Sequence, residues 1–466
     1  MKIKLLSLIT LIGASSIAFA QTTFSPKITI DADTGDNPYT IATGLINNDA
    51  FLDIVVGTDT DNELLVYLNN GDATFTKQPN IPNTISAVGG LKLVDLNNDT
   101  FLDLLVTAYT SDSVTWYAND GSGNFGVEQS IATVNGASGL FVGDVDGNLT
   151  PDVVVTSYDD NQVLWFSNDG AGNFTTPATS LIDNTLVAPG AVNMSDIDGD
   201  GDLDALVATA AYSGDVLEIF RNDLVPGGTV DFIKDATSVA TGKIGFFNAT
   251  FEDLDGDANL DILATEIKFG AMTGNFYWYE DNGAGFTETA FVTSIMNPSV
   301  AQHRDLDGDN LKDIILSSGT SNAGNDIVWY KNNGGTYGSE QVIDDTSSQA
   351  FVYNIADYDN DGDLDIASCE YNQDNLNLFK NNFIVLSTDD TNLEVATIYP
   401  NPAKDVLFFK GMTSETLNLE VYDILGKVVI QTSIEQNGSL DISELKNGMY
   451  ILKFETSDAT FKFVKE

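Results

Sequence analysis

Short apolar runs alternate with short acidic loops along most of the chain, and the same order of segments recurs. An apolar run such as 90–94 enters each loop, and a second run such as 102–106 leaves it. An alternating segment with an aromatic pair follows, and then a turn rich in Asn, Asp and Gly, at 119–125 in one copy. An outer segment, for example 125–131 or 174–182, ends the unit. Because period-two alternation and such turns are typical of hairpins, each unit predicts four antiparallel strands and no helix.

The unit is an internal repeat. Its acidic loop begins at seven positions, about 52 residues apart, namely Leu45, Asp95, Asp144, Asp196, Asp253, Asp305 and Asp357. Four-stranded units at this spacing are typical of propeller blades, so the pattern predicts an all-β fold with a seven-bladed β-propeller over residues 21–383. The last copy ends at Phe383 without an outer segment, and residues 24–30 supply a strand that fits its place. Pairing of the first strand with the last would close the ring and remove two open sheet edges; an open stack of hairpin units is the alternative.

The acidic loops carry the candidate chemistry. Carboxylates at positions 1, 3, 5 and 9 of a loop, with a backbone carbonyl near position 7, can surround a hard divalent cation with oxygen ligands. Four copies have the full set: Asp196, Asp198, Asp200 and Asp204; Asp253, Asp255, Asp257 and Asp261; Asp305, Asp307, Asp309 and Asp313; Asp357, Asp359, Asp361 and Asp365. Two copies have one Asn in the set: Asp95, Asn97, Asp99 and Asp103; Asp144, Asp146, Asn148 and Asp152. The first copy keeps only Asp49 and Asp53, and we expect it to be empty or weak.

Position 4 of the loop is Asn or Gly in every copy: Asn48, Asn98, Gly147, Gly199, Gly256, Gly308 and Asn360. These residue types tolerate the left-handed backbone of a chain that turns sharply around an ion. We therefore expect Ca2+ at four to six sites, with Mg2+ second because it prefers a stricter octahedron and keeps its waters. Solvated acidic turns without metal are the alternative, but the chain has few basic residues to relieve the repulsion between the carboxylates.

Charge and composition exclude several classes of protein. The chain has 69 acidic and 20 basic residues, a net charge of −49, so neither nucleic acid nor an anionic lipid surface is an expected partner. The single cysteine, Cys369, cannot form an intramolecular disulfide and reads as a buried strand residue. The single histidine, His303, excludes multi-histidine zinc sites, and a structural role is expected for it.

The two ends of the chain differ from the repeats. Residues 1–20 combine Lys2 and Lys4, an apolar run at 5–12 and the small-residue ending Ala18-Phe19-Ala20, which predicts a secretory signal peptide. No segment is long and apolar enough to predict a transmembrane helix. Residues 384–394 form a polar linker, and from 395 to 466 the charge balance returns, with seven Lys against ten acidic residues.

The motifs in both parts resemble known families. The Asp-rich loop, the apolar strand and the Asn-Asp-Gly-x-Gly-x-Phe turn resemble the FG-GAP or VCBS repeat of integrin-alpha-like seven-bladed propellers, and this resemblance implies calcium ligands at the Asp positions named above. Residues 395–466 resemble the type A C-terminal sorting domain of the type IX secretion system, a small β-sandwich. The matching segments are Tyr399-Pro400-Asn401-Pro402, 421–427, 445–450 and 462–465. This resemblance implies engagement of the secretion machinery, removal of the tail, and release to the medium or attachment to the outer-membrane surface.

Two functions remain open for the propeller. One is a calcium-stabilised module for adhesion or for binding a glycan or protein; the other is a carbohydrate-active lyase or hydrolase. Basic groups that could neutralise a uronic acid are few, which favours binding, although abundant Asp could hide a carboxylate pair for glycoside hydrolysis. In an antiparallel blade the second loops lie opposite the acidic loops. They begin with aromatic residues that are candidates for ligand binding or for packing between blades: Tyr109, Tyr158, Tyr212, Phe269 and Tyr371.

Overall fold

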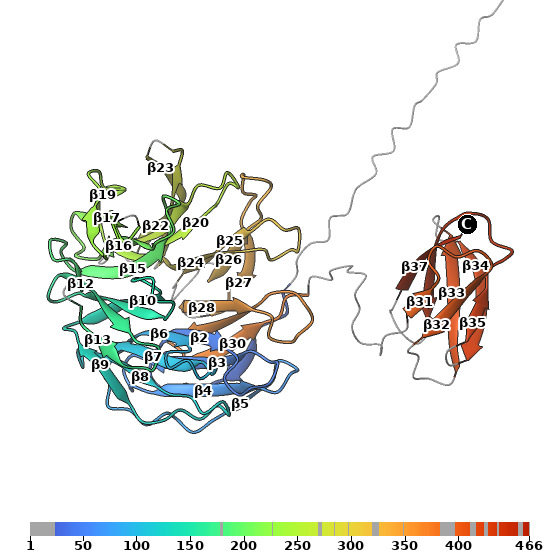
Figure 1. The fold of residues 1–466 in the computed structure, drawn as a ribbon, viewed down its shortest axis with the longest axis horizontal. Coiled ribbons are helices and arrows are strands. Elements are labelled where there is room, and N and C mark those ends of the chain that lie inside the picture. Colours follow the sequence, from blue (N-terminus) through green and yellow to red (C-terminus); the bar gives the residue numbers. More distant parts are fainter. Residues whose placement is uncertain are drawn as a thin grey trace, which may run out of the picture. The chain divides into compact units, whose positions relative to one another are not determined.

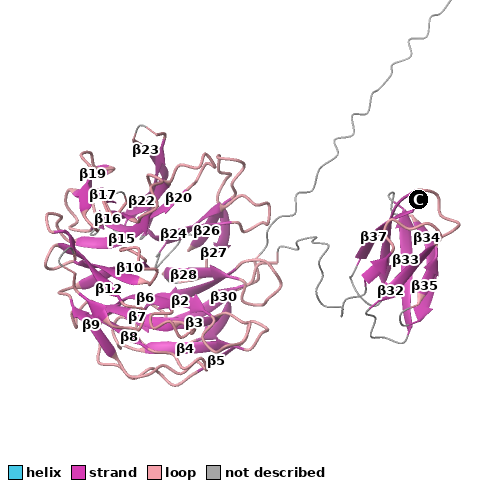
Figure 2. Cartoon of the chain, in the orientation of Figure 1, coloured by secondary structure: helices cyan, strands magenta, loops and turns pink. Residues whose placement is uncertain are grey.

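The structure is a computed structural model with two compact units, residues 1–383 and 384–466. It describes residues 24–177, 180–225, 227–268, 273–283, 285–296, 298–318, 326–347, 349–382, 397–410, 416–423, 427–435, 438–454 and 460–465. The predicted signal peptide at 1–20 and linker at 384–394 lie outside these residues. The described part of the chain is all-β, and no helix in it is long and apolar enough to cross a membrane (Figure 2).

The first unit contains seven sheets of four or five antiparallel strands within the described residues, and we number these blades in chain order. Blades 1 to 4 consist of β2 Pro38–Gly44, β3 Asp53–Thr58, β4 Leu64–Asn69 and β5 Phe75–Lys77; β6 Val88–Val94, β7 Asp103–Ala108, β8 Ser113–Tyr117 and β9 Gln129–Thr133; β10 Ala137–Gly143, β11 Asp152–Ser157, β12 Gln162–Asn168, β13 Phe174–Thr175 and β14 Leu181–Asp183; and β15 Pro189–Ser195, β16 Asp204–Thr209, β17 Asp215–Asn222, β18 Phe232–Lys234 and β19 Ala240–Lys243.

Blades 5 to 7 consist of β20 Phe246–Glu252, β21 Asp261–Lys268, β22 Thr273–Asp281 and β23 Phe286–Met296; β24 Pro298–Arg304, β25 Asp313–Ser318, β26 Ile327–Tyr330 and β27 Gln341–Asp344; and β28 Ala350–Ala356, β29 Asp365–Glu370, β30 Asn375–Phe379 and β1 Ile28–Asp31.

The blades form a closed ring (Figure 1). The first strand of each blade contacts the first strand of the next, in the order β2, β6, β10, β15, β20, β24 and β28, and β28 contacts β2 again. The last blade takes its outer strand from the start of the chain, since β1 pairs with β30 and places Ile28 opposite Leu378. An isolated bridge from Phe24 to Asn381 extends this pairing. The predicted closure of the ring by the N-terminal strand is confirmed.

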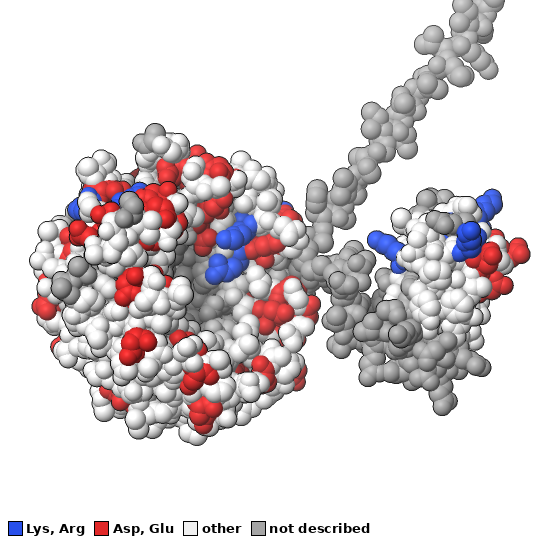
Figure 3. All heavy atoms as spheres, in the orientation of Figure 1, with Lys and Arg blue, Asp and Glu red and all other residues white. Residues whose placement is uncertain are grey.

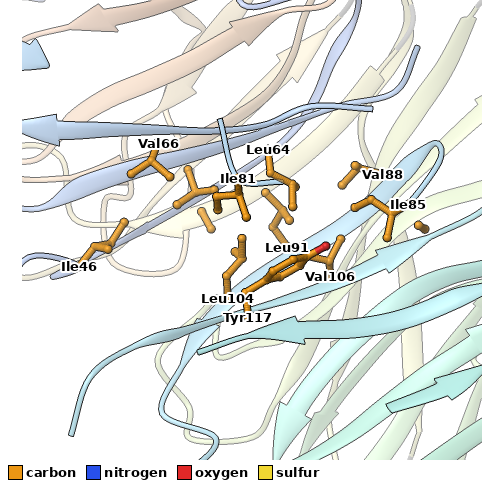
Figure 4. Close-up of a cluster of buried hydrophobic side chains, with 13 residues drawn as sticks. Ile46, Leu64, Val66, Ile81, Ile85, Val88, Leu91, Leu104, Val106 and Tyr117 are labelled. Carbon is orange, nitrogen blue, oxygen red and sulfur yellow. The ribbon is translucent and has the colours of Figure 1, made fainter. Parts of the chain in front are cut away.

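The hydrophobic core lies between blades rather than within one. The cluster in Figure 4 joins Leu64 and Val66 of blade 1 to Leu104, Val106 and Tyr117 of blade 2. Six similar clusters among the described residues join each of the other neighbouring pairs, the last of them joining blade 7 to blade 1. The second strand of a blade is therefore buried on both faces, which explains why it is a continuous apolar run rather than an alternating one.

The outer strands differ from the prediction. In blade 2 the strand begins at Gln129 and not at Phe125, because Phe125 forms only an isolated bridge to Asn119. In blade 3 the outer segment is split into β13 and β14. Pro177 follows β13, and its ring nitrogen cannot donate to a β-ladder. Among the described residues that follow it, Ser180 accepts through its carbonyl from the backbone N–H of Trp165, and β14 begins at Leu181.

The second unit is a small β-sandwich. One sheet has the order β31 Thr397–Tyr399, β32 Val406–Lys410 and β35 Ser439–Asp441. The other has the order β34 Val428–Glu435, β33 Thr416–Asp423, β36 Gly448–Phe454 and β37 Thr460–Lys465. Leu407 and Phe409 of the first sheet share one core with Leu419, Leu452 and Phe463 of the second, which confirms the predicted sandwich.

Candidate functional site

Each acidic loop joins the first strand of a blade to the second, and its position 9 is a buried brace. Oδ1 of this aspartate accepts a hydrogen bond, at 2.8–2.9 Å, from the backbone N–H of a residue near the end of the third strand. Oδ2 accepts one, at 2.9–3.2 Å, from the backbone N–H of loop position 2. The braces are Asp53, Asp103, Asp152, Asp204, Asp261, Asp313 and Asp365, each 0–1% exposed. The ninth aspartate therefore fixes the loop to its blade, a role that the spacing alone did not reveal.

Burial raises the pKa of the seven braces. Because burial disfavours the charged form, it raises the pKa of Asp53, Asp103, Asp152, Asp204 and Asp261 to about 6. The pKa of Asp313 and Asp365 rises to about 7 for the same reason. The two backbone donors oppose these shifts, and the neighbouring carboxylates reinforce them in most of the loops.

The loop backbone also turns as predicted. Position 4 has a positive φ in all seven copies, between 60° and 83°. Asn and Gly are the residue types that adopt this conformation at low cost. The prediction of a left-handed residue at position 4 is confirmed.

Five of the loops bring three carboxylates together within the described residues. In each group, one oxygen per residue lies within 4.8 Å of the others. The groups are Asp144, Asp146 and Asp152; Asp196, Asp198 and Asp204; Asp253, Asp255 and Asp257; Asp305, Asp307 and Asp313; and Asp357, Asp359 and Asp361. The remaining predicted ligands of these five loops, Asn148, Asp200, Asp261, Asp309 and Asp365, lie outside the three-residue groups.

The second loop forms no such group of carboxylates in the described structure. Its Asp95 carboxylate accepts hydrogen bonds from the backbone N–H of Asp99, at 3.2 Å, and of Thr100, at 2.8 Å, as Asp305 does in the sixth loop. The first loop lacks an acid at position 1, and Asp49 there accepts from the backbone N–H of Phe51 at 2.8 Å.

Several buried carboxylate oxygens in the loops have no hydrogen-bond partner among the described residues. They include Oδ1 of Asp144, Asp307, Asp357 and Asp359. Position 7 adds Oδ1 of Asp202 and Asp363, two residues that are only 5% and 7% exposed and that sequence reasoning missed because it assigned position 7 to a carbonyl. Buried polar atoms are rarely left unpaired, and an all-oxygen donor set suits a hard divalent cation, so these residues fit calcium.

A side-chain amide connects most loops to the loop of the preceding blade. Asn119 donates through Nδ2 to the carbonyl of Ile46 at 2.8 Å, and Asn69 donates to the carbonyl of Tyr358 at 2.8 Å, across the closure of the ring. Asn168, Asn222 and Asn381 repeat this contact at 2.9, 3.3 and 2.8 Å. We call these contacts amide bridges; they join the acidic loops into a nearly continuous belt.

Blades 5 and 6 depart from this pattern. In blade 5 the equivalent residue is Asp281, whose carboxylate cannot donate an N–H. A cavity of 740 Å³ opens there between blades 4 and 5, lined in part by Arg221, Asp235 and Asp281. In blade 6 the carbonyl of Leu254 accepts instead from the hydroxyl of Tyr337 at 2.9 Å.

A second cavity lies at the centre of the ring, along the first strands, and three of the aromatic candidates line it. The backbone N–H of Tyr109 donates to the carbonyl of Ala87 at the start of the first strand, so the second loops lie away from the acidic loops, as predicted. The cavity has a volume of 580 Å³ and is lined by residues of all seven first strands and by Tyr109, Tyr158 and Tyr212.

The aromatic candidates both pack and remain accessible. The rings of Tyr109 and Tyr158 meet edge to face at 6.0 Å, and the Tyr158 hydroxyl donates to the carbonyl of Ala210 in the next blade. Tyr109 and Tyr212 are nevertheless 37% and 41% exposed. Tyr371 contacts the rings of Tyr39 and Phe351 instead of lining the cavity, and Phe269 lies outside the described residues.

Sequence reasoning missed the aromatic residues at the second position of three first strands. These are Tyr39, Phe247 and Phe351, whose rings form a continuous cluster in which Phe351 lies 5.0 Å from each of the other two. The signal that could have found them is the shared register of the three residues within their repeats.

The surroundings of the site are acidic, and the single histidine lies away from both cavities. Figure 3 shows acidic side chains spread over the propeller around a central hollow, with a group of basic side chains at its edge. His303 is 1% exposed, and its Nε2 lies 3.2 Å from the hydroxyl of Tyr337, inside blade packing and away from either cavity. The structural role expected for it fits this position.

Comparisons with known proteins identify two kinds of module. Residues 397–466 match the secretion system C-terminal sorting domain, and residues 46–106, 95–155, 144–207 and 305–368 match the FG-GAP-like repeat. A search of curated proteins gave no match. The chain therefore carries FG-GAP-like repeats and a type IX sorting domain, which implies secretion to the cell surface or the extracellular space.

Several solved structures align with the chain at low sequence identity. Hydrazine synthase of Kuenenia stuttgartiensis aligns with a TM-score of 0.50 at 12% identity, over 73% of this chain and 95% of that chain. The Dos1 propeller aligns with a TM-score of 0.47 at 12% identity, over 83% and 92%. An Agrocybe aegerita lectin, described as recognising non-reducing terminal N-acetylglucosamine, aligns with a TM-score of 0.43 at 20% identity, over 70% and 82%. At these identities the likeness concerns the fold alone.

Proposed function

We propose that the chain is a secreted or surface-attached calcium-binding β-propeller that acts as a binding or adhesion module for a glycan or protein ligand. The observation that carries this proposal is the separation of two sites: the acidic loops at one end of the ring, and at the other end the accessible tyrosines that line the central cavity. Calcium would stabilise the ring, and the aromatic end would contact the ligand. Tyrosine rings suit both the apolar faces of sugars and the centres of protein interfaces.

The calcium part is supported by the buried carboxylate oxygens that have no other partner in the described structure. A site that fills only in the folded state adds about 2.7 kcal/mol at a hundredfold excess over its dissociation constant. We therefore expect the thermal midpoint of the purified full-length chain to rise steeply with calcium and to fall with a chelator. An unchanged midpoint under chelation would contradict calcium binding.

The ligand part is tested on the aromatic end. Glycan-array and pull-down screens of the purified chain, with and without calcium, identify the ligand class. The double variant Tyr109→Ala/Tyr158→Ala is expected to lose this ligand while its calcium-dependent melting is retained, because both residues lie at the far end from the acidic loops. Val127→Ala, at an exposed position outside the cavity, is the matched control and is expected to bind normally. Full binding by the double variant would mean that the tyrosines serve only to pack the blades.

The export part is tested on the tail. Deleting residues 395–466 is expected to leave a folded propeller in the periplasm, because the ring closes through β1 and β30 and the sandwich has a core of its own. Cell fractionation with limited proteolysis measures location and folding together. A tailless chain that still reached the surface would contradict the role of the sorting domain.

A further inference from the structure

Three blades carry a basic residue at one equivalent position, next to the acidic loop. Arg221, Lys331 and Lys380 each immediately precede the Asn whose backbone N–H binds the ninth aspartate. The third strand therefore presents each basic side chain to the loop of its own blade. The chain has only 20 basic residues, so three at one equivalent position are a notable share of them.

Each of these side chains forms an ion pair with loop carboxylates. Lys331 contacts Asp307 and lies 2.7 Å from Asp309, and Lys380 lies 3.2 Å from Asp359. Arg221 lies 3.3 Å from the brace Asp204 and 3.8 Å from Asp198. The three basic side chains are only 27–32% exposed, so their charges act close to the carboxylates and are partly shielded from solvent.

The other blades have no cation at this position. The equivalent residues are Leu68, Ala118, Ser167 and Glu280. Ser167 also reaches its loop, but as a neutral donor to Asp146 at 2.8 Å. The five loops that gather three carboxylates thus divide into three with an internal cation and two without one.

Even with the basic side chain in place, these three loops contain carboxylate oxygens without a hydrogen-bond partner in the described structure. The fourth, sixth and seventh loops each keep a carboxylate that is at least nine-tenths buried and has an unpaired oxygen: Asp202, Asp307 and Asp363, respectively. One ammonium or guanidinium cannot supply the six to eight contacts that a calcium ion makes. These loops therefore retain the features of a metal site while part of their charge is already balanced.

We propose that Arg221, Lys331 and Lys380 are tethered counter-ions that lower the calcium affinity of the fourth, sixth and seventh loops and hold these loops together when calcium is absent. The inference rests on the calcium part of the proposed function. A divalent cation that enters one of these loops has to displace the basic side chain or bind beside a like charge, and either event weakens binding. In the third and fifth loops the ion meets no such competitor, so a fall in calcium empties the two classes of loop at different concentrations.

The test is a pair of reciprocal substitutions in the full-length chain, measured by calorimetric titration with calcium and by melting in chelator. Lys331→Ser is expected to tighten one site by about tenfold and to lower the midpoint in chelator, because the sixth loop loses its internal cation. Ser167→Lys is expected to weaken one site by a similar factor and to raise the midpoint in chelator. Lys312→Ser is the matched control: Lys312 is in the sixth loop but pairs with Glu252 at 3.2 Å, and neither readout is expected to change.

The outcomes separate the two proposals. Calcium binding of equal affinity in the wild type and Lys331→Ser, with equal midpoints in chelator, would overturn the counter-ion role and leave the calcium sites standing. A chain that bound no calcium in any variant would overturn both. An effect of Lys312→Ser as large as that of Lys331→Ser would also overturn the proposal, because general charge and not position would then set the affinity.

Discussion

The first and seventh acidic loops have the same scaffold and different charge. In both, the ninth aspartate, Asp53 or Asp365, is fully buried and accepts hydrogen bonds from two backbone N–H groups at equivalent positions of its blade. The seventh loop then adds a converging group of Asp357, Asp359 and Asp361, whereas the first has Leu45 at position 1. The shape of the loop is thus independent of its ability to gather carboxylates. In both loops the ninth aspartate holds the fold, and in the seventh loop positions 1, 3 and 5 form the candidate metal group.

Removing a brace is the largest expected effect, and it tests whether the scaffold is shared. Asp53→Ala leaves the backbone N–H groups of Ile46 and Asn69 buried without a partner, so we expect a loss of about 3 kcal/mol in the free energy of unfolding. The loss should be the same with calcium and with chelator, measured by urea denaturation. Asp49→Ala in the same loop is the control and should cost little. A calcium-dependent loss at Asp53 would show that the first loop is a metal site after all.

Removing a candidate ligand is the next largest effect, and it tests the difference in charge. Asp359→Ala is expected to remove up to about 2.7 kcal/mol of stability at a hundredfold excess of calcium, and much less in chelator. Asp49→Ala should change neither value. Equal losses of calcium binding at Asp49 and Asp359 in a calorimetric titration would mean that spacing does not select the ligands.

The amide bridges also differ between blades, because blade 5 has Asp281 where five other blades have a bridging Asn. Asp281→Asn is expected to add a donor toward the loop of blade 4 and to stabilise the chain by about 1 kcal/mol, since a net hydrogen bond has this magnitude. Asn119→Ala should cost about as much by removing the bridge to Ile46. Thermal melting in chelator measures both. If Asp281→Asn has no effect while Asn119→Ala destabilises, blades 4 and 5 are too far apart for the bridge to form.

The smallest effect concerns pH. Burial raises the pKa of the ninth aspartates to about 6 or 7, above their ordinary value, so the folded state binds more protons than the unfolded chain. Their contribution is therefore complete at low pH and is lost as pH rises through 6 and 7. Calcium-free protein should melt at a higher temperature near pH 5.5 than near pH 7.5, and saturating calcium should reduce or reverse this trend because the ion favours the charged carboxylate. A higher midpoint at pH 7.5 without calcium would contradict the raised pKa values.

The repeat made the fold predictable. Seven copies of one pattern place the strands, the loops and the left-handed residue at position 4, because each depends on residues near one another in the sequence. The split outer strand of blade 3 was less predictable, because it depends on where pairing fails after Pro177.

The candidate site was predictable only in part. The spacing of Asp196, Asp198 and Asp204 is enough to identify a loop that gathers carboxylates. It cannot separate a brace from a ligand, because both are aspartates and the difference lies in the backbone N–H groups that Asp204 meets. The basic residues at Arg221, Lys331 and Lys380 are likewise distant from the loops in sequence, and only the third strand brings them close.

The pairing of β1 with β30 ties the folding of the chain to the order in which it is made. Lys27 and Glu370 form an ion pair at 2.6 Å although they lie 343 residues apart, so the first strand of the propeller to be synthesised pairs with nearly the last one. Contacts of such high sequence separation form late and slowly. A nascent or partly translocated chain cannot complete blade 7, and two sheet edges stay unpaired until then. Pairing of the N-terminal strand is thus possible only after the whole propeller has been synthesised. A chain truncated before blade 7 leaves β1 without its partner β30.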